Sequence, residues 1–225
     1  MPLLKLDKRL SAVAEEVRGE AVFDVGTDHA YLPVYLVENG ICSTACASDI
    51  NEGPLERARQ TVLSHGLENS IRLFLCDGTE GAPLDGVTDV ICAGMGGELI
   101  SRIVLSDERL KGKRLILQPM TKAPYLRQSL DANGFSLLSE KGVAVGRHIY
   151  TVMVWEYTGE PAVGGLFRHT GKLSVEREGD RAYLEAYLSS LEKELEGKRH
   201  SEPQKDFTLG YLVRELRKNI DVNKN

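Results

Sequence analysis

Residues 22–30, Val-Phe-Asp-Val-Gly-Thr-Asp-His-Ala, decide the fold of this chain. A short apolar run ends in an acid and a glycine turn, and helix-forming residues 31–38 follow directly. A strand, a tight loop and a helix in this order are typical of nucleotide-binding α/β domains, in which a cofactor lies over the carboxyl ends of parallel strands. The stretch therefore predicts a cofactor loop, with Asp24, Gly26 and Thr27 as residues that contact the ligand.

The loop departs at two positions from the glycine pattern of NAD-binding domains. The frame acid-x-Gly-x-Gly-x-Gly is present here as Asp24-x-Gly26-x-Asp28-x-Ala30. A dinucleotide needs the second glycine, because the backbone there approaches the pyrophosphate at a helix N-terminus. Asp28 would place a negative charge at that point and repel phosphates. A cofactor with no phosphate and a positive centre fits better, and S-adenosylmethionine is the common one.

The composition is that of a globular protein with a net acidic charge. The chain has 225 residues, of which 42% are hydrophobic and 27% charged, and its formal net charge is −5. This length supports one full core and a smaller appendage. The acidic balance argues against nucleic-acid binding through bulk charge, so any RNA contact has to come from local patches. The candidates, each of which can also be a solvated surface charge, are Arg109, Lys111, Lys113, Arg114, Arg168 and Lys172.

The cysteines and the apolar segments indicate the compartment. No segment has the apolar length of a membrane span, about 20 residues, and the N-terminus lacks the apolar core of a signal peptide. Cys46, Cys76 and Cys92 fall in expected strands, where a reduced cysteine packs as a small apolar side chain. Cys42 and Cys46 have no second ligand pair nearby, which argues against a zinc site. We expect a cytoplasmic protein without disulfides, metal or membrane contact, and a monomer is the favoured oligomeric state.

Strand-like and helix-like segments alternate along the first part of the chain. A leading helix over residues 6–17 has apolar residues at helical spacing and should cover the sheet. The alternation that follows specifies a parallel sheet with helices on both faces. Strands are expected at residues 21–24, 43–50, 71–76, 88–93 and 114–117, and helices at residues 31–38, 54–65, 98–105 and 124–133.

Two strands at the end of this region break the alternation. Residues 135–145 and 148–157 are joined only by Gly146 and Arg147, which is too short for a crossover helix, so these strands must pair antiparallel. A parallel sheet closed by an antiparallel hairpin is the arrangement of class I methyltransferases and not of dinucleotide dehydrogenases. We therefore predict an α/β fold in which residues 1–158 form a Rossmann-like class I methyltransferase domain that binds S-adenosylmethionine.

The sequence pattern changes after Tyr157. Thr158-Gly159-Glu160-Pro161 interrupts it, and leucines then recur at helical spacing over residues 180–198 and again from residue 209. Two such helices with a short polar connector at residues 200–204 form an antiparallel hairpin. We expect residues 159–225 to be a small C-terminal helical, coiled-coil-like domain. Its role can be structural, or it can dimerise or grip a substrate.

Side chains at the ends of the expected strands could hold an adenosine-containing cofactor. An acid at the end of the second strand can accept hydrogen bonds from both ribose hydroxyls, and one at the end of the third can accept from the adenine amine. The fourth strand ends in residues 93–97, Ala-Gly-Met-Gly-Gly, which leave space beside the expected reactive centre. Each feature alone is more often a turn or a surface cap, but their order indicates a cofactor site. Its expected residues are Asp24, Gly26, Thr27, Asp49, Ile50, Asp77, Gly78, Ala93 and Gly94.

The whole set of motifs resembles a known family, the bacterial tRNA N1-adenine-22 methyltransferases. The resemblance covers roughly residues 5–157 and implies methyl transfer from S-adenosylmethionine to N1 of one adenine in the D-arm of tRNA. It also implies a helical C-terminal domain, although the tail matches the family less well than the core. The motifs that carry it are Asp-Val-Gly-Thr-Asp-His-Ala-Tyr-Leu-Pro (24–33), Asn-Glu-Gly-Pro (51–54), Asp-Gly (77–78), Ile-Cys-Ala-Gly-Met-Gly-Gly (91–97) and Leu-Ile-Leu-Gln-Pro-Met (115–120).

Such a reaction needs placement more than proton removal. Adenine N1 has a free lone pair at neutral pH, so the main task is to hold it in line with the methyl carbon and the sulfur. Methylation makes the ring cationic, and a carboxylate nearby would stabilise the transition state; Asp28 is the candidate. We expect His29 to contact the cofactor carboxylate or orient the base, Met95 to line the methyl path and Gln118 to read the base edge. The alternatives are a loop residue that bonds backbone for His29 and a core side chain for Met95.

Other functions fit parts of the pattern. A methyltransferase that acts on a small molecule or a protein would suit the acidic balance and would not need the tail. A non-catalytic binding protein could keep the cofactor fold and use the helical hairpin for interaction, although the acids of the pocket argue against it. An NAD-linked oxidoreductase is disfavoured by Asp28 and by the antiparallel hairpin.

Overall fold

A computed structural model describes residues 4–198 and 203–221 of the chain. Its centre is a seven-stranded sheet with the strand order β3-β2-β1-β4-β5-β7-β6. The first five strands are parallel, and β7 pairs antiparallel with both β5 and β6. This order confirms the predicted class I methyltransferase sheet. The strands are β1 (Ala21–Val25), β2 (Thr44–Asp49), β3 (Ile71–Leu75), β4 (Asp89–Gly96), β5 (Arg114–Thr121), β6 (Phe135–Val145) and β7 (His148–Tyr157).

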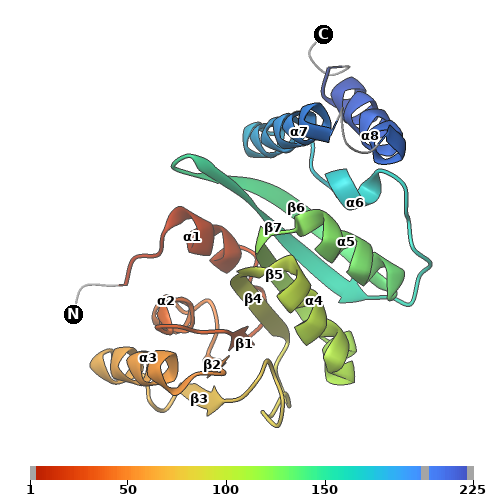
Figure 1. The fold of residues 1–225 in the computed structure, drawn as a ribbon. Coiled ribbons are helices and arrows are strands. Elements are labelled where there is room, and N and C mark those ends of the chain that lie inside the picture. Colours follow the sequence, from red (N-terminus) through yellow and green to blue (C-terminus); the bar gives the residue numbers. More distant parts are fainter. Residues whose placement is uncertain (1–3, 199–202, 222–225) are drawn as a thin grey trace.

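Helices cover both faces of the sheet (Figure 1). The helices α1, α2 and α3 bury apolar side chains against one face, whereas α4 and α5 do so against the other. None of the helices in the described residues is long and apolar enough to cross a membrane. The helices of this region are α1 (Lys8–Ala14), α2 (Tyr31–Glu38), α3 (Glu52–Ser64), α4 (Gly97–Ser106) and α5 (Ala123–Ala132), with a 3₁₀ helix η1 (Glu108–Gly112) after α4.

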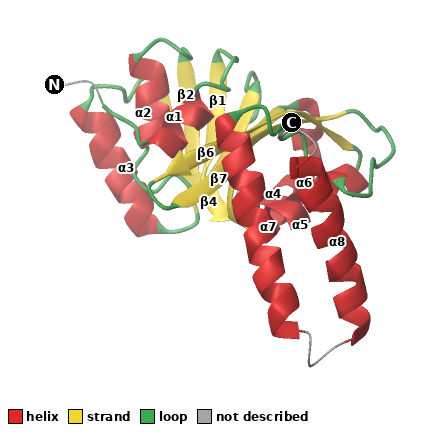
Figure 2. Cartoon of the chain, turned by 90° about the horizontal axis from the view of Figure 1, so that it is seen from above, coloured by secondary structure: helices red, strands yellow, loops and turns green. Residues whose placement is uncertain are grey.

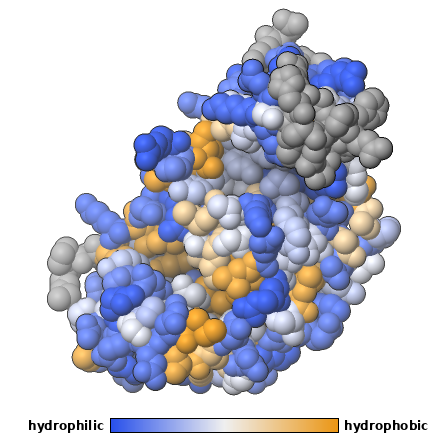
Figure 3. Space-filling model, in the orientation of Figure 1, coloured by the Kyte–Doolittle hydropathy of each residue, from blue (hydrophilic) through white to orange (hydrophobic). Residues whose placement is uncertain are grey.

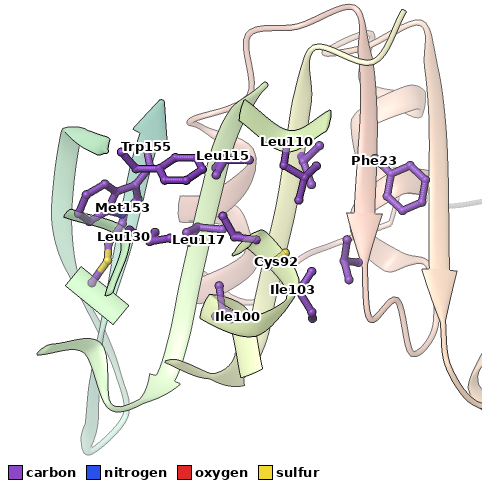
Figure 4. Packing of buried hydrophobic residues seen from close by; sticks show 14 of the residues in the cluster. Phe23, Cys92, Ile100, Ile103, Leu110, Leu115, Leu117, Leu130, Met153 and Trp155 are labelled. Atoms are coloured by element: carbon purple, nitrogen blue, oxygen red, sulfur yellow. The ribbon is translucent and has the colours of Figure 1, made fainter. Parts of the chain in front are cut away.

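The strand sequences explain the two layers. Successive side chains of a strand point to opposite faces, so a strand covered on both sides must be apolar throughout. In β1, Val22 packs under α1 and α2, while its neighbour Phe23 belongs to the layer under α4 and α5. Figure 4 shows this second layer, in which Trp155 and Leu115 from β7 and β5 meet side chains of α4 and α5. Burial on both faces holds the parallel strands in register and fixes where their carboxyl ends lie.

The predicted element boundaries differ from the structure at the end of β4. A loop was expected from residue 94, but β4 runs to Gly96 and α4 begins at Gly97. The pairing with β5 shifts register on both sides of Met95, and Gly94 has φ +83°. A glycine in the left-handed region forms a bulge after which pairing can resume, so both strands extend further than their apolar runs indicate. The leading helix is also shorter than predicted: Asp7 caps its start at Lys8, and it ends at Ala14.

The C-terminal helices α7 (Glu178–Lys198) and α8 (Pro203–Asp221) lie side by side (Figure 2). Leu191, Val213 and Leu216 form the buried seam between them. This confirms the predicted helical hairpin, while its expected connector lies largely outside the described residues. A short helix α6 (Phe167–Thr170), which the sequence did not predict, precedes them. The strand β7 ends at Tyr157, one residue before the expected domain boundary, which stays a prediction.

A buried ion pair ties this tail to the sheet. The side chains of Arg127 in α5 and Glu140 in β6 are both completely buried, with 2.6 Å between Nη2 and Oε1. Glu140 also accepts hydrogen bonds from the Thr151 hydroxyl at 2.5 Å and from the Lys172 N–H at 3.1 Å. The second terminal nitrogen of Arg127 donates to carbonyl oxygens in α6, one of them that of His169 at 3.1 Å. The pair therefore fixes α6 and the start of the tail against α5 and β6.

Candidate active site

The strand order brings the predicted site residues to one edge of the sheet. The strands β3, β2, β1 and β4 are neighbours and run parallel, so their carboxyl ends lie side by side. Asp77, Asp49 and Asp24 lie within two residues of the ends of β3, β2 and β1, and Ala93 lies at the bulge of β4. Ligands of open parallel sheets bind outside the carboxyl ends of the strands, at the point where the strand order reverses. In this sheet the order reverses between β1 and β4.

The loop between β1 and α2 is held tightly at this edge. The backbone N–H groups of Gly26 and Thr27 both donate to the Ser48 carbonyl oxygen, at 2.8 and 2.9 Å. Gly26 has φ +77°, and a Cβ atom there would lie 3.3 Å from the sulfur of Met95. A side chain at this position would therefore be strained and would press on Met95. Met95 itself is half-buried over the loop and packs against the core, so a core role and a place beside the methyl path are compatible.

A cavity of about 400 Å³ opens above this loop. Seven of the predicted site residues line it, together with residues of α1 and of the start of α2. The seven are Asp24, Gly26, Thr27, Asp28, His29, Ala93 and Gly94.

Asp24 is the buried acid of this cavity. Its exposed fraction is 6%, and burial raises the pKa of its carboxyl to about 7, although a hydrogen bond with Thr27 lowers that pKa part of the way back. A carboxyl group in this state is half ionised near neutral pH. A positively charged group in the cavity would favour its ionised form and would be bound by it.

Arg9 is a cavity residue that the sequence reasoning missed. It comes from α1, which was expected only to cover the sheet, and its side chain is 18% exposed. Its Nη1 atom donates to the Gln118 side-chain oxygen at 2.7 Å and would lie 3.4 Å from a Cβ atom at Gly94. Nothing in the spacing of α1 singles it out, because only the folded chain brings α1 next to the end of β4. Arg9 gives the cavity a cation suited to a carboxylate ligand.

Gln118 is buried and is not open to the cavity as a residue that reads a base would be. It is completely buried, and its side-chain oxygen accepts from Arg9 and from the backbone N–H of Gly94 at 3.0 Å. Its amide nitrogen donates to the Pro119 carbonyl oxygen at 3.0 Å. In this arrangement Gln118 orients Arg9 and the bulge of β4, and its role in reading a base remains a prediction.

Asp28, His29 and Tyr31 form the outer wall of the cavity. Asp28 is 62% exposed and is paired with Arg57 of α3, and the His29 Nε2 atom lies 3.6 Å from its carboxylate. The rings of His29 and Tyr31 are stacked, with centroids 5.0 Å apart and planes 9° apart. Tyr31 is 45% exposed, so its ring is open to solvent at the mouth of the cavity. Two stacked rings at the mouth offer a surface for a planar group.

The remaining predicted residues surround the cavity without lining it. Asp49 accepts from the Asn51 N–H at 2.8 Å, and Ile50 beside it is exposed. Asp77 lines a neighbouring cavity of about 350 Å³ and receives two hydrogen bonds from Arg102, at 2.9 and 3.0 Å. These bonds hold the pKa of its carboxyl below the usual range. Gly78 receives a hydrogen bond from the Ser48 hydroxyl at 2.6 Å, which joins the ends of β2 and β3.

The edge as a whole suits a small zwitterion attached to a nucleoside. The buried acid Asp24 can bind a cation, Arg9 can bind a carboxylate, and the half-buried acids Asp49 and Asp77 lie at the ends of the next two strands. Gly94 lines the cavity and is exposed, so it leaves this part of β4 open to a second, flat molecule, whereas Gly97 is buried against the backbone of Lys122. No cluster of three or more potential metal ligands occurs within residues 4–198 and 203–221. The four cysteines are free thiols.

Comparisons with known proteins agree with this chemistry. A methyltransferase domain family matches residues 6–153. The tRNA (adenine(22)-N(1))-methyltransferase of Bacillus subtilis (strain 168) is 35% identical over 196 residues, which cover 84% of this chain and 82% of the relative.

Two solved structures contain the cofactor or its product. The M. capricolum TrmK in complex with S-adenosyl-homocysteine superposes with a TM-score of 0.82 at 27% identity, covering 96% of this chain and 98% of the other. The Streptococcus pneumoniae protein Sp1610 in complex with S-adenosyl-L-methionine gives a TM-score of 0.81 at 30% identity, covering 96% and 100%. On this evidence, the chain belongs to the family of tRNA (adenine(22)-N(1))-methyltransferases.

Proposed function

We propose that this protein transfers the methyl group of S-adenosylmethionine to N1 of adenine 22 in the D-arm of tRNA. One observation carries the proposal: the cavity combines a buried acid, Asp24, with the cation Arg9 and a glycine-lined opening at the end of β4. The relative from Bacillus subtilis, whose name states this reaction, supports the choice of tRNA and of the N1 atom.

The residues present fit S-adenosylmethionine. Gly26 and Gly94 both have positive φ, and side chains there would press on Met95 and Arg9, so both positions keep the cavity clear. Asp24 would hold the ammonium group of the amino-acid end and Arg9 its carboxylate. Asp49 and Asp77 would hold the ribose and the adenine, as expected from their strand ends. When bound, the cofactor supplies an electrophilic methyl group on a sulfonium sulfur.

The chain's own residues then have to place the target base. Gly94 has no side chain to block the adenine edge, and the stacked His29 and Tyr31 rings can support the base plane. Asp28 lies beside His29 and is largely exposed, so its carboxylate can face the positive charge that develops on the ring. The base needs no prior deprotonation, so none of these groups has to act as a general base on N1.

Mapping of the product tests this proposal. Full-length protein would be incubated with labelled S-adenosylmethionine and an unmodified tRNA transcript that has adenine at position 22, or with a matched transcript that has guanine there. We expect 1-methyladenosine at position 22 of the first transcript, identified by mass spectrometry of nuclease fragments, and no transfer to the second. Transfer to another atom or position, or only to small molecules or proteins, would contradict the proposal.

A further inference from the structure

We infer that the turn between β6 and β7 and the start of α1 together form a contact surface for the tRNA backbone next to the cavity. This surface, the basic rim, consists of Lys5, Lys8, Arg147 and His148. The inference rests on the proposed tRNA substrate and adds the place where the chain touches it outside the reactive centre.

The strand register places the β6–β7 turn at the edge of the cavity. The strand β7 runs antiparallel to β5, with Leu117 opposite Met153, so the beginning of β7 at His148 lies toward the carboxyl end of β5. That is the edge at which β4 and the loop of Gly26 bound the cavity. The turn therefore extends past the edge on the side of the reactive centre.

The start of α1 lies at the same edge. Arg9 of its first turn lines the cavity and bonds to Gln118 near the end of β5. The other end of α1 is fixed to β6, since Lys141 lies 2.8 Å from Glu15 and 2.9 Å from Glu16. Figure 1 shows the β6–β7 hairpin reaching over α1. Asp7, Arg9 and Leu10 line the cavity, so Lys5 and Lys8 belong to the segment that forms this wall. The β6–β7 hairpin approaches the same segment through the contacts of Lys141.

The charges of the basic rim are free to meet phosphates. Lys5, Lys8 and Arg147 are exposed, and none of them has an ion pair within the part of the chain that the structure describes. Residues 141–155 contain no carboxylate. The acid nearest in sequence is Asp7, whose carboxylate accepts from the Leu10 N–H at 2.7 Å as the cap of α1. Figure 3 shows hydrophilic side chains at this end of the hairpin, with hydrophobic ones beside them.

The turn also offers an aromatic surface. The rings of His148 and Tyr150 stack with centroids 6.1 Å apart and planes 24° apart. Cations next to exposed rings are the usual combination in RNA-binding surfaces, where phosphates meet the charges and sugars or bases meet the rings. An acidic protein substrate would meet the same charges but has no reason to need the rings, so the observations favour RNA.

The cations of residues 109–114, which the sequence suggested for RNA contact, form ion pairs and hydrogen bonds within the protein instead. Arg109 is bonded to Asp107, and Lys113 donates to the carbonyl oxygens of Leu84 and Val87 at 3.0 and 2.7 Å. These residues precede β5 and therefore lie at its amino end, away from the cavity. The two other candidates are also bonded within the protein: Arg168 donates to the His169 ring at 2.8 Å, and Lys172 donates to the Leu138 carbonyl oxygen at 3.2 Å. The basic rim is therefore the better candidate for phosphate contacts.

Charge reversal with a matched control tests the inference. The variants are K8E, R147E and their double variant, and the control is R18E, an exposed arginine whose backbone N–H donates to Asp89 at the amino end of β4. The KM for the tRNA transcript and its dependence on salt would be measured for each, together with S-adenosylhomocysteine affinity by calorimetry. We expect each reversal in the rim to raise the KM by about tenfold and to reduce the slope of log affinity against log salt by about 1.

The inference requires that kcat at saturating tRNA and the affinity for S-adenosylhomocysteine stay at wild-type values in K8E and R147E. A wild-type KM and salt slope in the double variant would overturn it. It would also be overturned if R18E raised the KM equally, because the effect would then come from net charge, or if the variants lost cofactor affinity. Failure of the proposed function is recognised separately, since the wild-type protein would then not methylate tRNA.

Discussion

The cavity and the junction with the tail each bury a carboxyl group, but they surround it differently. In the junction, Glu140 has the Arg127 guanidinium, the Thr151 hydroxyl and the Lys172 N–H as partners. In the cavity, Asp24 is almost as deeply buried and has a hydrogen bond with Thr27, yet its pKa is raised to about 7.

The difference indicates that Glu140 has a structural role, whereas Asp24 can pair with a positively charged ligand. Ionising a buried carboxyl is costly unless a counter-ion and hydrogen bonds compensate. The ion pair of Glu140 is complete within the protein, so it can stabilise the position of the tail. Compensation at Asp24 is incomplete, and the missing positive charge is one that S-adenosylmethionine can supply.

The largest effect on stability is expected from breaking the ion pair between Arg127 and Glu140. Arg127→Met would leave Glu140 buried without its cation and should lower the free energy of unfolding by roughly 3–5 kcal/mol. Urea unfolding followed by circular dichroism measures this change. The double variant Arg127→Met, Glu140→Leu should recover part of the loss, because no unpaired charge remains. A single variant as stable as the wild type would show that the two buried carboxyl groups do not differ in the way described.

The next effect concerns the outer wall of the cavity. Asp28→Asn and His29→Ala should each lower kcat for methyl transfer at saturating tRNA by about 100-fold, because a charge or an orienting ring near the reacting base is lost. Affinity for S-adenosylhomocysteine should change much less in Asp28→Asn. Single-turnover kinetics with labelled cofactor measures the methyl-transfer step. Wild-type kcat in both variants would remove this loop from the chemistry.

A smaller and more selective effect is expected at Arg9. Arg9→Met should weaken binding of S-adenosylhomocysteine by roughly tenfold to 100-fold, since a hydrogen-bonded charge pair with the ligand carboxylate is lost. Binding of 5′-methylthioadenosine, which has no carboxylate, should hardly change. Calorimetry with both ligands makes the comparison. Equal losses for the two ligands would mean that Arg9 acts only through the shape of the cavity.

Much of the fold could be predicted from the sequence because its signals are local. Apolar runs that end in an acid or a glycine marked the strands β1 to β4, and the two-residue link at Gly146 and Arg147 required the antiparallel hairpin that β6 and β7 form. The predicted end of β4 at residue 93 was wrong, because glycines normally indicate a loop. Gly94 here makes a bulge instead, and the strand continues to Gly96.

The site was only partly predictable, for a related reason. Residues at strand ends, such as Asp24 and Asp28, could be found because the order of parallel strands places them at one edge. Arg9 could not, since its contact with Gln118 joins segments that are distant in the sequence. The basic rim was missed for the same reason: its cations are scattered over two segments, and the contiguous run 109–114 gave a stronger signal although its charges serve the fold.

The pH dependence of S-adenosylhomocysteine binding tests the role of Asp24 most directly. With a pKa of about 7 in the free protein, this carboxyl must lose a proton below neutral pH before it can pair with the ligand's ammonium group. Affinity measured by calorimetry should therefore rise by about tenfold or more from pH 5.5 to pH 7.5 and then level off, and it should be weaker and nearly flat in Asp24→Asn. The stability of the ligand-free protein should change in the opposite direction, since a pKa raised by folding gives stability at low pH that is lost as the pH rises through 7. Wild-type affinity that stays constant or falls over this range would contradict the account.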